Sequence, residues 1–155
     1  MKYDYHIIVI GAGSGGLVVA SGAAGLGAKV ALVEGHKMGG DCLNYGCVPS
    51  KSFLKAAHLA ADIQKAGDYG LMNAGFETDL GKVMDRVQSI IDEIEPHDSK
   101  DRYEGLGVDV LDGHYGQLVD RHTVKVGDKT ITGKYIVVST GAEASIPPIP
   151  GLSEV

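Results

Sequence analysis

Long apolar runs and blocks of like charge are both missing from this sequence. No stretch approaches the roughly 20 apolar residues of a membrane-spanning helix, and the apolar run at residues 7–10 is too short for the core of a secretory signal. The formal net charge is -6 and there is no basic stripe, which argues against nucleic-acid binding. The sequence therefore predicts a cytoplasmic protein that binds neither a membrane nor nucleic acid.

Cysteine is also scarce, because only Cys42 and Cys47 are present. A closely spaced pair in a reducing compartment is more often redox-active or metal-binding than structural. Glycine, by contrast, is abundant, with 23 residues among 155. Many glycines fall in the first half of the chain, which suggests tight turns or a backbone that approaches a ligand closely.

The order of strand and helix patterns predicts one α/β domain. Residues 5–10 and 29–33 are apolar strands, and residues 14–26 between them form a helix rich in small side chains. Helical periodicity predicts one helix that opens at residues 48–50 and ends at Gly67, and another from Asp79 that Pro96 breaks or kinks. A short helix follows Ser99, and the later part is strand-like.

The later strands are predicted to form two groups. Residues 117–119, 123–126 and 130–132 are expected to form a small antiparallel meander. Two further buried strands are expected at residues 108–111 and 135–139. The fold class is therefore α/β, with a central parallel sheet and a small antiparallel β-meander insertion.

Residues 11–16 satisfy the pattern G-x-G-x-x-G between the first strand and the first helix, which makes the fold Rossmann-like. Gly11 permits the tight turn, Gly13 lets a pyrophosphate reach the backbone, and Gly16 lets helix and strand pack closely. The helix, with Ser14 in its first turn, directs N–H groups and its positive end at the anion.

Glu34 ends the second strand, where a carboxylate can accept hydrogen bonds from the hydroxyls of an adenosine ribose. The same carboxylate would repel a 2′-phosphate. A glycine-rich turn beside an exposed glutamate is the plainer interpretation, which the strand-loop-helix-strand context disfavours. The fingerprint alone does not separate FAD from NAD.

The stretch from Gly39 to Lys51 holds both cysteines. Cα atoms five residues apart in a helix are roughly 8 to 9 Å apart, too far for a disulfide, so the chain must curl more tightly, which Gly46 permits. The small ring would add little stability, and a helix N-terminus beside the pair lowers a thiol pKa, so a redox role is favoured. There are two alternatives. The first is a metal site, for which two thiols with scattered His36 and Asp41 are a weak ligand set. The second is a pair of inert thiols.

These residues together resemble the redox and nucleotide motifs of the pyridine nucleotide-disulfide oxidoreductases, in particular lipoamide dehydrogenase and mercuric reductase. The resemblance extends over nearly the whole chain. It implies an FAD-binding domain, with Cys42 as the thiol that meets the substrate and Cys47 as the thiol beside the flavin. It also implies that Lys51 lies near the flavin N5 and that Glu34 holds the adenosine ribose. No metal site is expected.

The resemblance implies further cofactor-binding residues. Gly40 and Asp41 would lie beside the pyrophosphate, Gly116 would lie near the adenine, and Thr140 and Gly141 would lie near the FAD. Two residues depart from the family pattern. Asp41 replaces a common threonine and brings a carboxylate near another anion, and Tyr45 replaces a small apolar residue.

The resemblance also implies parts that the sequence does not contain: a second G-x-G-x-x-G for NAD(P)H, and a dimerisation domain. We therefore expect residues 1–155 to be the N-terminal FAD-binding part of a longer, homodimeric enzyme, inactive alone and weak in holding FAD. The enzyme would pass electrons from NAD(P)H through FAD to Cys42–Cys47, and on to a small dithiol, a disulfide or mercuric ion. The alternative is a stand-alone dinucleotide-binding module with a redox-sensing disulfide.

Overall fold

The computed structural model describes residues 2–72, 74–143 and 145–154. Its centre is a parallel sheet of four strands, in the order β3 (Val108–Asp112), β2 (Val30–Glu34), β1 (Tyr5–Ile10) and β6 (Lys129–Val138). β1 and β2 are near-continuous apolar runs because side chains on both of their faces are buried. The predicted Rossmann-like α/β arrangement is confirmed.

Two helices cover one face of this sheet. α1 (Ser14–Gly25) packs Leu17 and Ala20 against the strands, and α5 (Lys100–Gly105) adds the buried ring of Tyr103. The small residues of α1 let its backbone lie close to β1 and β2. Ser99 caps α5, because its hydroxyl accepts a hydrogen bond from the Arg102 N–H at 3.3 Å, as the sequence predicts.

An antiparallel meander covers the other face. It consists of β4 (Gly116–Asp120), β5 (Thr123–Val126) and the first part of β6. Val124 and Val126 on β5 form one buried cluster with side chains of the parallel sheet, including Ile8. The meander is therefore part of the domain core.

The separation of residues 130–132 from residues 135–139 was wrong. Residues 129–138 form one strand, β6, which pairs antiparallel with β5 in its first part and parallel with β1 from Gly133 onward. A Cβ atom on Gly133 would lie 2.8 Å from Cγ1 of Ile8, so this glycine marks a close approach and does not interrupt the strand.

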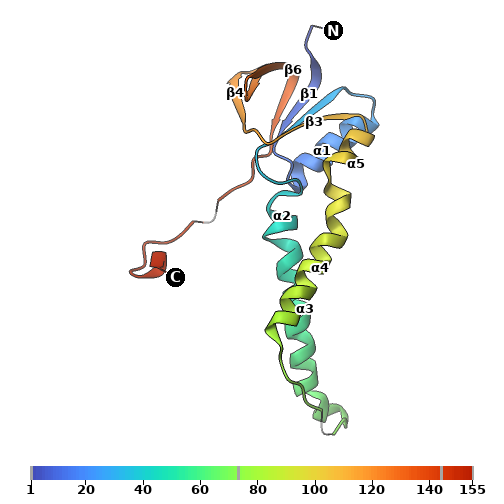
Figure 1. Cartoon of the computed structure of the whole chain (residues 1–155), viewed down its shortest axis with the longest axis vertical. Helices are drawn as coiled ribbons and strands as arrows, with labels where there is room; N and C mark the ends of the chain where they lie inside the picture. Colours follow the sequence, from blue (N-terminus) through green and yellow to red (C-terminus); the bar gives the residue numbers. More distant parts are fainter. Residues whose placement is uncertain (1, 73, 144, 155) are drawn as a thin grey trace.

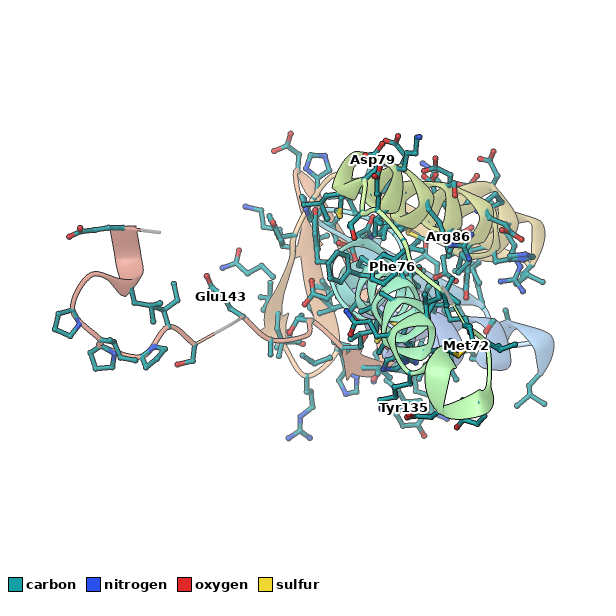
Figure 2. All side chains as sticks on the ribbon, turned by 90° about the horizontal axis from the view of Figure 1, so that it is seen from below. Met72, Phe76, Asp79, Arg86, Tyr135 and Glu143 are labelled. Atoms are coloured by element: carbon teal, nitrogen blue, oxygen red, sulfur yellow. The ribbon has the colours of Figure 1, made fainter. Side chains whose placement is uncertain are left out.

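The remaining helices form a long hairpin that extends away from the sheet (Figure 1). α2 (Gly40–Asn44) leads into α3 (Cys47–Gln64), and η1 (Ala66–Tyr69) follows. α4 (Leu80–Asp98) returns along α3, and Asp79 caps its N-terminus, because the Asp79 side chain accepts a hydrogen bond from the Lys82 N–H at 3.2 Å. Figure 2, seen from below, shows Phe76 and Asp79 on the link that enters α4.

Two predicted helix ends differ from the structure. α3 ends at Gln64 rather than Gly67, because the chain tightens there into the 3₁₀ turn η1. α4 continues through Pro96, which lies in its last turn, and ends two residues later.

The C-terminal segment leads away from the sheet past Glu143, and η2 (Leu152–Glu154) lies near its end (Figures 1 and 2). None of the described helices is both long enough and apolar enough to span a bilayer.

Val124→Ala is expected to lower the free energy of unfolding by about 2 kcal/mol, because the fully buried valine attaches the meander to the sheet. Val119→Ala on the neighbouring strand β4 is the matched control, since Val119 is 60% exposed and its truncation should change the value by less than about 0.5 kcal/mol. Urea unfolding followed by circular dichroism measures both. Equal losses in the two variants would mean that β5 does not pack on the sheet.

Candidate functional site

Backbone atoms pack closely against the loop between β1 and α1. Gly11 has φ +101°, a left-handed conformation, and a Cβ atom there would lie 2.3 Å from the Ser139 carbonyl oxygen at the end of β6. A Cβ atom on Gly16 would lie 1.8 Å from the Gly11 carbonyl oxygen. The left-handed conformation of Gly11 is the tight turn that the sequence predicts, and the contact at Gly16 is the predicted close packing of helix and strand.

The first turn of α1 presents amide donors beside this loop that have no acceptor within the helix. The first intrahelical bond runs from the Leu17 N–H to the Gly13 carbonyl, so the amides of Ser14 and its next two neighbours have no helical acceptor. Within the described part of the chain, no side chain caps this end and no acidic residue lies in its first turn. The free N–H groups and the helix dipole therefore favour an anion here.

Glu34 is held in place by two backbone N–H groups. Its Oε2 accepts from the Ala12 N–H at 2.6 Å, and its Oε1 accepts from the His36 N–H at 2.7 Å. Each carboxylate oxygen has a further acceptor site, and the residue lines the cavity described below. The carboxylate is thus oriented at the end of β2 with capacity left for ligand hydroxyls.

The glycines that precede the cysteines pack directly on the phosphate loop. The Gly39 N–H donates to the Ala12 carbonyl at 2.9 Å, and a Cβ atom on Gly40 would lie 2.6 Å from the Gly13 Cα. The Asn44 amide donates to the Gly40 carbonyl at 2.9 Å and so holds this segment in shape. The segment that bears the cysteines is therefore anchored to the loop that faces the anion.

Cys42 and Cys47 are free thiols at the junction of α2 and α3. The chain curls tightly between them, since the Gly46 N–H donates to the Asp41 carbonyl at 2.6 Å, five residues back. This is the compact turn that the sequence predicts. Cys42 is half-buried, whereas Cys47 is exposed and begins α3.

The pKa of Cys42 lies above its ordinary value. Hydrogen bonding with the Cys47 thiol is the largest cause and burial the next, while the positive charge of Lys51 acts in the opposite direction. This direction differs from the lowered thiol pKa expected at a helix N-terminus. Cys42 lies within the short helix α2, and its hydrogen bond with the neighbouring thiol is the largest influence on its pKa.

One cavity of about 550 Å³ brings most of the predicted residues together. The predicted residues that line it are Gly11, Gly13, Ser14, Glu34, Gly40, Asp41, Cys42, Gly116, Thr140 and Gly141. Three predicted residues, Gly16, Cys47 and Lys51, lie outside the lining. Gly16 is buried beneath the loop, and Cys47 and Lys51 are exposed at the start of α3.

The cavity also has lining residues beyond the predicted site residues. The Ser139 hydroxyl donates to the Ile10 and Gly11 carbonyls, both at 3.0 Å, and joins the end of β6 to the phosphate loop. The Tyr115 ring packs on Gly35, where a Cβ atom would lie 2.3 Å from it. The sequence signal that could have identified Ser139 is its position as a hydroxyl residue at the end of a buried strand. His36, Lys37 and Tyr45 also line the cavity.

The residues present fit a dinucleotide. Glycine backbone and amide donors suit a pyrophosphate, and the fixed carboxylate of Glu34 suits a ribose. Cys42 forms part of the wall of the same cavity. Among the residues that the structure describes, no three His, Cys, Asp or Glu side chains gather as a metal site would require.

Comparisons with known proteins agree with this geometry. Residues 5–155 match the family described as pyridine nucleotide-disulphide oxidoreductase. Dihydrolipoyl dehydrogenase of Acholeplasma laidlawii is 37% identical over 99% of the chain and 46% of its own length. Mercuric reductase of Staphylococcus aureus is 34% identical over 98% of the chain and 28% of its own length.

A solved structure is similar as well. The Cu(II) complex of the HOCl-induced flavoprotein disulfide reductase RclA from Escherichia coli superimposes with a TM-score of 0.75 and 25% identity, over 96% of this chain and 30% of that one. The chain thus spans less than half the length of these relatives. With the family match over almost every residue, this chain belongs to the pyridine nucleotide-disulfide oxidoreductase family.

Proposed function

We propose that this chain binds FAD in the glycine-lined cavity and serves as the flavin domain of a disulfide oxidoreductase. The observation that carries the proposal is a single cavity that both Glu34 and Cys42 line. The free amides at the start of α1 would hold the pyrophosphate, and Glu34 would hold the adenosine ribose. The isoalloxazine ring would then lie toward the cysteines.

The cysteine pair would be the site of electron exchange. FAD, when bound, would carry two electrons between NAD(P)H and the thiols. Oxidation of NAD(P)H to NAD(P)⁺ supplies these electrons, and cleavage of the Cys42–Cys47 bond with uptake of two protons consumes them.

The two thiols would then have different tasks. The Cys42 thiolate attacks a substrate disulfide and releases one thiol, and the Cys47 thiolate attacks Cys42 and releases the second. Lys51 is close enough to favour the Cys42 thiolate, since its charge opposes the rise in the Cys42 pKa. In the reverse direction the same steps would oxidise a dithiol.

The substrate, nucleotide and assembly of the whole protein belong to this proposal. Relatives named for lipoyl, mercuric and glutathione substrates are all similar, so a small dithiol, a disulfide or mercuric ion is the substrate class. NAD(P)H would bind outside residues 1–155, and the complete protein would be a homodimer. Gly40, Asp41, Gly116, Thr140 and Gly141 would line the FAD, because all five line the cavity.

Glu34→Ala is expected to weaken binding of ADP by roughly 10- to 100-fold, because hydrogen bonds to a charged acceptor are lost. Glu93→Ala, on the exposed side of α4, is the matched control and should bind ADP as the wild type does. Isothermal titration calorimetry of both variants provides the comparison, with circular dichroism to check the fold. An unchanged affinity in Glu34→Ala would remove the ribose role.

Cys47→Ser in the protein encoded by the full reading frame should abolish NAD(P)H-dependent turnover but leave FAD bound. The serine cannot complete the disulfide, whereas the cavity lining stays intact. Turnover is measured as NADH or NADPH oxidation with lipoamide, glutathione disulfide or Hg²⁺ as acceptor, and bound FAD by its visible absorbance. Ser50→Ala, one turn further along α3, is the control. Persistent turnover in Cys47→Ser would refute the role of the pair.

A further inference from the structure

Two side chains from separate turns meet at the edge of the cavity. His36 follows the end of β2, and Tyr45 follows the end of α2. His36 Nε2 and the Tyr45 hydroxyl are 2.9 Å apart, and their rings are stacked with centroids 6.1 Å apart at 15°. Both residues line the cavity, although Tyr45 is 58% exposed.

The contact joins two segments that carry predicted site residues. The His36 N–H donates to Glu34 Oε1 at 2.7 Å, so His36 is attached to the carboxylate that faces the ribose. The Tyr45 N–H donates to the Asp41 carbonyl at 2.9 Å, so Tyr45 is attached to the turn that carries both cysteines. A hydrogen bond between the two side chains therefore ties the segment of Glu34 to the turn of the cysteines.

A third side chain supports the same contact. The Lys37 ammonium lies 5.6 Å from the centre of the Tyr45 ring, within the range of a cation–π interaction. Lys37 also lines the cavity. The tyrosine is thus contacted through its hydroxyl by His36 and through its ring by Lys37, which fixes it at the rim.

The segments that this contact joins are rich in glycine, and glycine segments lose the most conformational freedom when they become ordered. Ordering of loops is a cost that reduces affinity, and a contact that orders them before binding reduces this cost. Because His36 and Tyr45 both line the cavity, a ligand bound there leaves only after their hydrogen bond breaks or the two turns move together.

We propose that His36 and Tyr45 form a clasp, meaning this hydrogen-bonded pair of residues, that holds the two turns together and slows the release of FAD. The inference rests on the proposed function, because it takes FAD as the ligand of the cavity. His36 and Tyr45 are positioning residues in this account. They act through the turns that carry Glu34 and the cysteines.

The test uses the FAD-containing protein encoded by the full reading frame. Tyr45→Phe and His36→Phe each keep an aromatic ring but remove the hydrogen bond, and each should release FAD roughly two- to tenfold faster. The double variant should release FAD no faster than the faster single variant, because both changes break one interaction. Release is followed as the rise of flavin fluorescence after dilution.

Tyr69→Phe is the matched control, since Tyr69 is 83% exposed on η1, at the far end of α3 from the cavity. It should release FAD at the wild-type rate. Thermal unfolding of the FAD-free proteins gives the second readout, which the clasp variants should leave close to wild type. If the clasp variants release FAD faster and their FAD-free forms also unfold at a clearly lower temperature than the wild type, the two residues have a structural role and the clasp is overturned.

Two other results would overturn the inference. Wild-type release rates in both Tyr45→Phe and His36→Phe would show that the contact is a surface feature only. Multiplying effects in the double variant would show that the two residues act independently. A wild-type protein that holds no FAD would instead refute the proposed function, and the clasp with it, so the two failures are distinct.

Discussion

Close contact between backbone segments organises the whole site. The β1–α1 loop touches the end of β6 at Ser139 and the first residue of α2 at Gly40, with no room for a side chain at either contact. Because these three segments cannot move apart without losing their packing, the anion-binding amides, Glu34 and the cysteine turn keep a fixed relation. The parallel sheet supplies this arrangement, since β1, β2 and β6 end at the same edge.

The charges around the cavity follow from this geometry. The positive end of α1 faces the position of a pyrophosphate, while each oxygen of the Glu34 carboxylate accepts from one backbone amide, that of Ala12 or that of His36. Asp41 adds a second carboxylate to the lining, where the family pattern has a threonine. In the described structure its backbone carbonyl accepts from Tyr45 and Gly46, which contributes to the cysteine turn.

The sequence is sufficient to predict the parts of the site whose conformation depends on steric contacts between residues close together in the chain. Gly11, Gly16 and Glu34 carry a fingerprint whose every residue has one physical task, so strand, turn and helix were predicted correctly. The break between residues 130–132 and 135–139 was predicted wrongly, because only the Ile8 side chain in the neighbouring strand shows why Gly133 is needed inside β6. The contact between His36 and Tyr45 depends on the paths of two turns, which no local pattern specifies.

The central claim is that one cavity brings a dinucleotide to the cysteine pair, and amide NMR of the reduced 155-residue chain tests it most directly. Addition of ADP should shift the amides of residues 11–16 and those beside Glu34, whereas FAD should shift these and also the amides around Cys42 and Cys47. Shifts from FAD that leave the cysteine turn unchanged, or that fall on the α3–α4 hairpin instead, would contradict the account.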